Sequence, residues 1–231
     1  QGGSEANESS LKMAQAYHVR NGDRGRYKII SRDGSYHGST YLTEWLGGHP
    51  GFPRTDYQPS PQHLIHVDQP NYYRRKYENE SINEFTDRLI QDIEDKILFH
   101  GPESISCFIG EPVSQPLGGV VPPSEYWPRV KEVCLKYGIL LIFDEVITGW
   151  GRTGSPFASQ EYGVTPDIIT MAKATTNGIS PLGAVACKEE IYDTVMDGSP
   201  KGTIELFHGY TYSGIPVSVA AGLAVQDIFE K

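Results

Sequence analysis

The sequence predicts an α/β fold with a mostly parallel sheet flanked by helices. Short apolar runs typical of buried strands alternate with longer segments whose apolar residues recur every three or four positions, as in amphipathic helices. The clearest apolar run is residues 139–143, Ile-Leu-Leu-Ile-Phe, which contains no polar residue. Strands that are separated by helices are usually joined by right-handed crossovers and lie parallel in one sheet.

The first hundred residues contain two predicted helices and one predicted strand. Ser4 is a suitable N-cap for a helix that runs to about Arg20, and Gly22 follows near its end. A strand is expected at residues 27–31. Residues 36–77, which are rich in Gly, Pro and Tyr, are expected to form a long functional loop. The second helix has apolar residues at steps of three and four, namely Ile82, Phe85, Leu89, Ile93 and Ile97.

The rest of the chain continues the alternation of strand and helix. A strand at residues 104–113 ends around Glu111-Pro112. The next helix is stopped by Gly138 and carries the apolar positions Trp127, Val130, Cys134 and Tyr137. Three more strands are expected at residues 139–146, 168–172 and 183–186. The last twenty residues, 212–231, begin as a loop and become helical.

Composition argues against several classes of protein. The 231 residues are 38% hydrophobic and 21% charged, which is ordinary for a soluble globular chain. A net charge of −9 gives no basic footprint for nucleic acid, and no apolar stretch approaches the roughly 18 residues of a membrane span. Cys107, Cys134 and Cys187 are widely spaced in apolar surroundings, which indicates reduced thiols of a cytoplasmic protein. No His or Cys spacing matches a common metal site, so no metal is expected.

Two ionisable residues at the ends of predicted strands carry the strongest functional signal. Asp144 follows the run 139–143, where a carboxylate is costly unless a cation meets it, and Lys173 follows the strand at 168–172. Carboxyl ends of parallel strands commonly form ligand sites. Pyridoxal 5′-phosphate needs both a covalent lysine anchor and a counter-charge for its ring nitrogen. The structural alternatives are an ion pair of Asp144 with an arginine such as Arg152, and a lysine that emerges into water.

Three further segments could contribute to a site. Gly2-Gly3-Ser4-Glu5 opens a helix and could bind phosphate through free N–H groups, or it is only a glycine turn with a serine cap. Tyr36 could stack on a flat cofactor ring, or it anchors a loop by hydrophobic contact. The polar loop at residues 208–214 could donate hydrogen bonds to a phosphate, or it is only a connector.

Several segments resemble class III pyridoxal-phosphate aminotransferases, and they occur in the order seen in that family. They are Gly3-Ser4-Glu5-Ala6-Asn7, Tyr36-His37-Gly38, Glu111-Pro112, residues 143–154, Met171-Ala172-Lys173 and residues 209–214. The segments with the acid and the lysine are highly specific. Residues 175–185 and 208–213 are most similar to ω-amino acid:pyruvate (β-alanine:pyruvate) aminotransferases. The resemblance covers essentially the whole chain.

The resemblance implies the fold-type I transferase fold, pyridoxal 5′-phosphate as cofactor and roles for two catalytic residues. Lys173 would bind the cofactor as a Schiff base and transfer the proton. Asp144 would pair with the pyridine nitrogen. Tyr36 and Val146 would lie on the two faces of the ring.

The other implied roles concern the phosphate, the substrate and the assembly. Gly3 and Ser4 would hold the phosphate within the subunit. Thr211 would reach the phosphate of the neighbouring subunit in a homodimer. Glu111 would pair with a mobile arginine that binds the substrate carboxylate. One departure is Ile215-Pro216, where the family usually has His-Pro, and it removes no catalytic group.

Family members are about twice as long as this chain. The resemblance therefore implies that residues 1–231 are the central part of the large cofactor-binding domain. The N-terminal segment and the C-terminal small domain of the family would be missing. Such a chain could carry the cofactor contacts without being active alone.

The function implied by the resemblance is an aminotransferase that moves an amino group from an ω-amino acid or amine to a 2-oxo acid such as pyruvate. Another enzyme on the same scaffold, an aminomutase, decarboxylase or racemase, is one alternative. A non-catalytic fragment that binds a partner is a second, although it would have no reason to keep both Lys173 and Asp144. A dehydrogenase is disfavoured because no Gly-x-Gly-x-x-Gly follows a strand.

Overall fold

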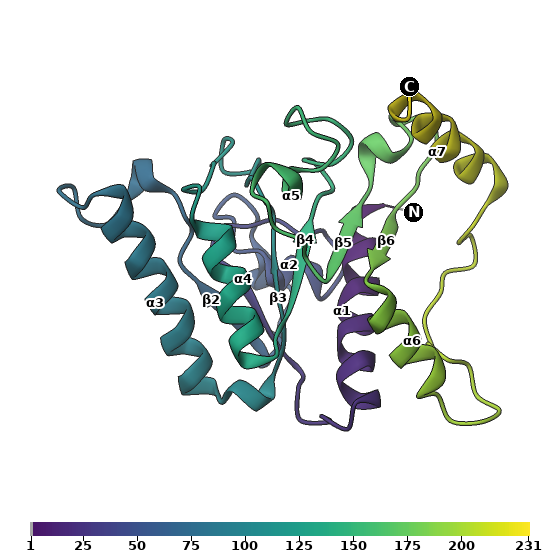
Figure 1. Ribbon diagram of the computed structural model, residues 1–231, viewed down its shortest axis with the longest axis horizontal. Helices are drawn as coiled ribbons and strands as arrows, with labels where there is room; N and C mark the ends of the chain where they lie inside the picture. Colours follow the sequence, from purple (N-terminus) through teal and green to yellow (C-terminus); the bar gives the residue numbers. More distant parts are fainter. Residues whose placement is uncertain (1) are drawn as a thin grey trace.

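The computed structural model describes residues 2–231 and contains a six-stranded sheet with helices on both faces (Figure 1). The strand order is β2 (Leu64–Val67), β1 (Lys28–Arg32), β3 (Ile105–Gly110), β4 (Leu140–Asp144), β5 (Ile168–Met171) and β6 (Ala184–Cys187). Neighbouring strands are parallel, except that β6 runs antiparallel to β5. The predicted α/β class with a mostly parallel sheet is confirmed.

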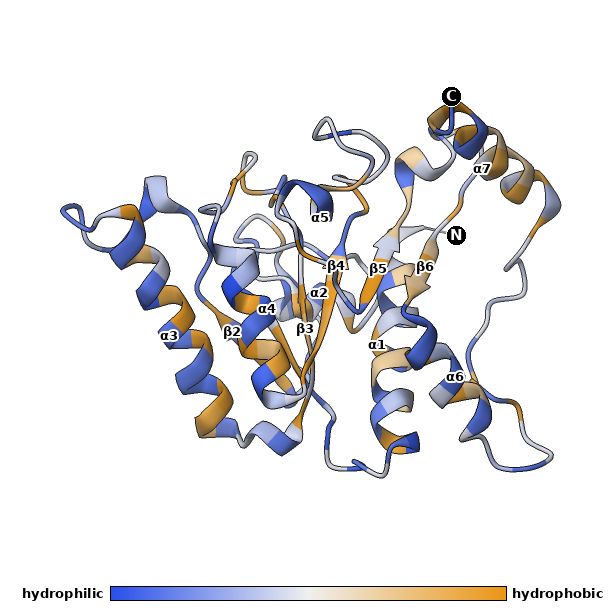
Figure 2. Ribbon diagram, in the orientation of Figure 1, coloured by the Kyte–Doolittle hydropathy of each residue, from blue (hydrophilic) through white to orange (hydrophobic). Residues whose placement is uncertain are grey.

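The two faces of the sheet carry separate hydrophobic cores. On one face the strands pack against α3 (Ile82–His100) and α4 (Tyr126–Tyr137). On the other face they pack against α1 (Gly3–Arg20) and α6 (Glu189–Asp197). Adjacent strand residues such as Ile29 and Ile30 belong to different cores, because side chains alternate across a strand. The central strands are accordingly orange in Figure 2, between helices with hydrophilic outer residues.

Three more helices complete the described chain, namely α2 (Thr43–Leu46), α5 (Ala158–Glu161) and α7 (Pro216–Phe229). Single 3₁₀ turns lie at residues 54–56, 72–74, 102–104 and 173–175. No helix within residues 2–231 is both long and apolar enough to cross a membrane.

Helix ends follow local chemistry, with one correction. As predicted, α4 ends at Gly138, whose left-handed backbone (φ 64°) suits glycine. The prediction that Ser4 caps the first helix is wrong, because Gly2 occupies the N-cap position and Ser4 lies inside the first turn. The Ser4 hydroxyl instead accepts a hydrogen bond from the backbone N–H of Ser39, 3.1 Å away.

Four elements were not predicted from the sequence, namely the short helices α2 and α5, strand β2 and helix α6. Strand β2 lies inside residues 36–77, which were expected to be a loop, and it pairs with β1 from Ile29 opposite Leu64. It is a four-residue edge strand, so its apolar alternation is too short to stand out. Helix α6 begins directly after β6 with Lys188 as N-cap, and only Ile191 and Val195 are buried in it.

Asp167 joins three elements just before β5. Its carboxylate accepts hydrogen bonds from Lys131 Nζ of α4 at 2.8 Å, Lys188 Nζ at 2.7 Å and the N–H of Leu141 at 2.8 Å. Burial alone would raise the pKa of Asp167, but the two lysines and the Leu141 N–H together hold the pKa below its ordinary value of 3.8. Asp167 therefore has a structural role, and the amines of Lys131 and Lys188 are held in ion pairs with it.

We expect Asp167→Asn to destabilise the protein by roughly 2–3 kcal/mol, because one partner of a largely buried ion cluster is lost. The Lys188 side chain is partly exposed, and solvent screens its interaction with Asp167. The expected loss is therefore smaller than for a fully buried ion pair. Since the folded-state pKa is lowered, the stabilisation is fully present above pH 3.8 and is lost as the pH falls through the folded value. Urea midpoints of wild type and variant should therefore converge in acid, and a gap that is independent of pH would contradict this account.

Candidate functional site

Seven of the eight predicted site residues line one pocket beyond the carboxyl ends of the strands. They are Gly3, Ser4, Tyr36, Glu111, Asp144, Val146 and Lys173. The eighth, Thr211, does not line this pocket and lies exposed on the segment between α6 and α7. The pocket is completed by Asn7, His37, Gly38, Val113 and Ile147. Residues far apart in the sequence thus meet at the edge where ligands bind in open α/β sheets.

Asp144 is the last residue of β4, and only 5% of it is exposed. Its Oδ2 atom accepts hydrogen bonds from Asn7 Nδ2 and His37 Nδ1, both at 2.8 Å. Its Oδ1 atom accepts one from the N–H of Val146 at 3.1 Å. The alternative ion pair with Arg152 is not found within residues 2–231, where Arg152 is exposed. Three donors therefore stabilise the carboxylate beside the pocket.

Asn7 was missed as a functional residue by sequence reasoning, although it belongs to the motif Gly3–Asn7. It lies one turn into α1 and is almost completely buried. Besides its contact with Asp144, its amide nitrogen donates to the carbonyl of His37 at 2.6 Å, and its amide oxygen accepts from Thr170 Oγ1 at 2.7 Å. Neither hydrophobic periodicity nor metal spacing marks such a residue, so only the family motif included Asn7 itself.

Lys173 follows β5 and opens a single 3₁₀ turn. Its backbone has a φ of 47°, a left-handed conformation that costs a residue other than glycine about 1–3 kcal/mol and is frequent at functional sites. Its exposure in this chain is that of the alternative of a lysine that emerges into water. The side chain is exposed, and no hydrogen bond or ion pair holds its amine in the part of the chain that the structure describes. The amine is thus free to react at the pocket wall.

The first turn of α1 is packed against two other walls of the pocket. A Cβ on Gly3 would lie 2.9 Å from both methyl carbons of Val146, so a larger residue would displace that side chain. A Cβ on Gly38 (φ 140°) would lie 2.5 Å from Ser4 Oγ. Because the first N–H groups of a helix have no partner inside it, this turn presents donors and a positive dipole end to an anion.

Glu111 follows β3 and is paired inside the chain. Its carboxylate accepts hydrogen bonds from Arg32 Nη2 at 3.2 Å and from the N–H of Tyr36 at 3.3 Å. Arg32 is completely buried, with its guanidinium 5.0 Å from the centre of the Trp127 ring. Sequence reasoning missed Arg32, because a charged last residue of a strand is usually solvated. The Arg32–Glu111 pair fixes the backbone at Tyr36.

The neighbouring acid Glu145 has a different, structural task. Its carboxylate accepts hydrogen bonds from the Thr148 hydroxyl at 2.7 Å and from the N–H groups of Ala158 and Ser159 at 2.9 and 2.8 Å. These contacts close the loop before α5 and satisfy the start of that helix. Two adjacent acids thus face different surroundings, and only Asp144 lines the pocket.

The pocket combines a free amine, a buried carboxylate, an aromatic side chain and a helix start. This combination suits a flat ligand with a carbonyl group, a protonated ring nitrogen and a phosphate. Among the described residues no group of three or more His, Cys, Asp and Glu side chains could hold a metal ion.

Comparisons with known proteins point to one family. The family model described as aminotransferase class-III matches residues 1–231. Gamma aminobutyrate transaminase 2 of Solanum lycopersicum is 39% identical over 99% of this chain and 50% of its own length. Probable gamma-aminobutyrate transaminase 4 of Oryza sativa subsp. japonica is 40% identical over 99% of this chain and 47% of its own length. The chain thus spans about half the length of the curated relatives that it matches.

Solved structures agree with the sequence relatives. A thermostable (S)-enantioselective omega-transaminase from Thermomicrobium roseum is 44% identical with a TM-score of 0.93, over 99% of this chain and 50% of that chain. An amine transaminase from an uncultivated Pseudomonas species in its PLP-bound form is 39% identical with a TM-score of 0.93, over 100% of this chain and 51% of that chain. The omega transaminase of Pseudomonas jessenii in complex with PMP is 41% identical with a TM-score of 0.93, over 99% of this chain and 50% of that chain.

Proposed function

Because the chain belongs to the class III aminotransferase family, we propose that it binds pyridoxal 5′-phosphate in this pocket and acts as a transaminase. The observation that carries this proposal is the meeting of Lys173, Asp144 and the first turn of α1 around one pocket. The PLP-bound and PMP-bound forms of two similar transaminases support the choice of cofactor.

The residues present fit this cofactor at both ends. The N–H groups of Gly3 and Ser4 at the start of α1 would hold the phosphate. The Ser4 hydroxyl would donate its proton to the phosphate while its oxygen accepts from the N–H of Ser39. Asp144 would stand opposite the ring nitrogen. Tyr36 and Val146 would contact the two ring faces, since both line the pocket.

When bound, the cofactor would supply an electron sink for the carbon that carries the substrate amine. Lys173 would hold the cofactor covalently through its amine until the substrate amine takes its place. The released lysine would then move the proton as a positioned base. Asp144 would keep a negative charge beside the ring nitrogen and so favour its protonated form.

We propose an ω-amino acid or amine as donor and a 2-oxo acid such as pyruvate as acceptor. The names of the relatives, gamma-aminobutyrate transaminases and omega-transaminases, support a donor of this kind. Glu111, already held by Arg32, would pair in addition with a mobile arginine near the substrate carboxylate, as the family resemblance implies. Alanine formation from pyruvate with β-alanine, γ-aminobutyrate or a simple amine tests this function. Consumption of these amines without alanine formation would contradict it.

We propose that the working form is a homodimer in which Thr211 donates to the phosphate of the other subunit. Thr211 lies exposed beyond a segment that is fastened to α1. Lys12 Nζ of α1 donates to the carbonyl of Phe207 at 3.0 Å, and Ser9 Oγ lies 2.5 Å from His208 Nε2. These two contacts attach residues 207 and 208 to α1. They support a position of Thr211 on the subunit surface, where it would reach a partner.

We expect Thr211→Ala to weaken cofactor retention by the dimer roughly 10- to 100-fold, since a hydrogen bond to a charged group contributes about 1.5–3 kcal/mol. Thr211→Ser keeps the hydroxyl and is the matched control, with retention close to wild type. Dialysis combined with light scattering measures both retention and assembly. A monomer that retains its cofactor equally with Thr and Ala would contradict the shared site.

We propose that the 231-residue chain has little turnover alone, because it spans about half of its relatives. Helix α7 also exposes apolar side chains, including Val217, Leu223 and Ile228. Such a face favours nonspecific association of the chain by itself. A soluble monomer of this length with full turnover would contradict the proposal.

A reducing compartment is proposed as well, and the cytoplasm is the one predicted from the sequence. All three cysteines are free, and Cys107 and Cys134 are buried. Burial raises the pKa of Cys107 to about 12, so this thiol is unreactive. Several relatives are named as mitochondrial or chloroplastic proteins. Microscopy of the tagged full-length protein tests the compartment, and a signal confined to an organelle would contradict the cytoplasm.

A further inference from the structure

We propose that His37 is a positioning residue that fixes Asp144 so that the Oδ1 atom, rather than Oδ2, faces the ring nitrogen of the cofactor. The inference rests on the proposed function, because it concerns the cofactor that the pocket would bind. His37 has no exposed side-chain surface, and its Nδ1 atom lies 2.8 Å from Asp144 Oδ2. In the sequence it belongs to the motif Tyr36-His37-Gly38, in which only Tyr36 has an implied role.

The two oxygens of Asp144 have unequal surroundings. Oδ2 receives two short side-chain hydrogen bonds, from His37 and Asn7, and these occupy its accepting positions. Among residues 2–231, Oδ1 receives only the N–H of Val146, at 3.1 Å. A carboxylate oxygen has two lone pairs, so Oδ1 keeps one for a further donor. A protonated ring nitrogen is a donor of this kind.

The amide of Asn7 cannot be reversed without loss of this arrangement. Thr170 Oγ1 donates to Asn7 Oδ1, whereas Asn7 Nδ2 faces the His37 carbonyl and Asp144 Oδ2, which both accept. A flipped amide would place its oxygen against two acceptors. Asn7 also lies on the helix whose first turn would hold the phosphate. Helix α1 therefore sets the distance between the phosphate site and the Asp144 carboxylate.

The contacts of His37 also define its proton. An ionised Asp144 can only accept, so Nδ1 of His37 carries the hydrogen that points to it. The other nitrogen, Nε2, is buried and has no hydrogen-bond partner in residues 2–231. His37 therefore orients Asp144 through Nδ1 alone.

The test compares binding of pyridoxal 5′-phosphate with binding of its 1-deaza analogue, in which C–H replaces the ring nitrogen. Wild type should prefer the natural cofactor. His37→Gln, whose amide nitrogen stands near the Nε2 position, should lower that preference roughly 10- to 100-fold, the range for a hydrogen bond to a charged group. His37→Asn, whose amide nitrogen stands near Nδ1, should keep the preference within a few-fold.

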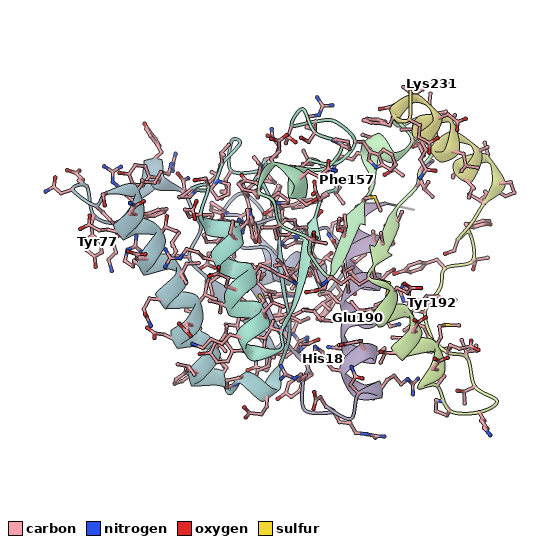
Figure 3. The ribbon with its side chains drawn as sticks, in the orientation of Figure 1. His18, Tyr77, Phe157, Glu190, Tyr192 and Lys231 are labelled. Atoms are coloured by element: carbon pink, nitrogen blue, oxygen red, sulfur yellow. The ribbon has the colours of Figure 1, made fainter. Side chains whose placement is uncertain are left out.

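A matched control is His18, the other buried histidine among residues 2–231. His18 lies near the far end of α1, where its Nε2 atom is 2.8 Å from the carbonyl of Ser106 (Figure 3). His18→Leu should lower the melting temperature but leave the preference unchanged. If His37→Gln fails to fold, His37→Asn still decides the matter, because this variant keeps a donor near Nδ1. Loss of the preference in a folded His37→Asn protein would contradict positioning through that hydrogen bond.

The outcomes separate this inference from the proposed function. A wild-type preference that survives unchanged in His37→Gln, or that is lost in a folded His37→Asn protein, would overturn the positioning role and leave the proposed function intact. Equal binding of both cofactors by the wild type would contradict the pairing of Asp144 with the ring nitrogen, on which both proposals depend.

Discussion

Lys173→Ala should lose nearly all turnover while still binding pyridoxal 5′-phosphate noncovalently. A positioned base alone contributes roughly 10²–10⁴-fold to the rate, and Lys173 would also provide the covalent anchor. The phosphate contacts at α1 and the carboxylate of Asp144 would remain in the variant. Steady-state rates and dialysis measure the two effects separately. A variant with more than a tenth of the wild-type rate would contradict the assignment.

Borohydride reduction identifies the anchor directly. The cofactor should be recovered on the peptide that contains Met171-Ala172-Lys173. Three other lysines are already engaged, since Lys131 and Lys188 bind Asp167 and Lys136 binds Glu94. Lys131→Ala is therefore a control that should leave labelling unchanged. Label on Lys131, Lys136 or Lys188 would show that a lysine other than Lys173 anchors the cofactor.

The second large effect is expected for Asp144→Asn, which keeps the size of the side chain and removes its charge. Turnover should fall roughly 10²–10³-fold, as for other electrostatic groups that are fixed in an active site. Cofactor retention should fall much less, because the phosphate and ring contacts remain. The charge is needed most when electrons move from the substrate carbon into the protonated ring.

Glu145→Gln is the matched control for Asp144→Asn. Glu145 is also a buried acid after the same strand, but its hydrogen bonds go to Thr148 and to the start of α5. Its replacement should lower the melting temperature and reduce turnover far less than Asp144→Asn does. Equal losses of turnover in both variants would show that general damage to this loop, rather than the charge beside the ring, explains the effect.

Much of the fold could be predicted because its strongest signals are local. The run Ile139–Phe143 and the periodic helix from Ile82 to Ile97 correspond to β4 and α3. Strand β2 could not be predicted, because four residues on a sheet edge gain their stability from pairing with β1, far away in the sequence. The antiparallel direction of β6 is likewise decided by its partner and not by its own composition.

The site could be predicted where chemistry and position coincide in the sequence. Lys173 and Asp144 each follow an apolar run, and the structure brings both to one pocket. Asn7, His37 and Arg32 were missed because their importance lies in which partner they meet. A buried amide or imidazole is recognisable only when its hydrogen bonds are known. The exposure of Lys173 could not be decided from the sequence, which left a lysine emerging into water as an alternative, and the structure shows it exposed.

The central claim is that this pocket transfers amino groups through pyridoxal 5′-phosphate, and a half-reaction without acceptor tests it most directly. The cofactor-loaded protein is mixed with β-alanine or γ-aminobutyrate, and the cofactor forms and the products are quantified. We predict conversion of the bound cofactor to pyridoxamine 5′-phosphate with release of the matching oxo acid. Added pyruvate should restore the original form and yield alanine. An unchanged cofactor together with carbon dioxide or a rearranged amino acid, or no reaction with any amine, would contradict the account.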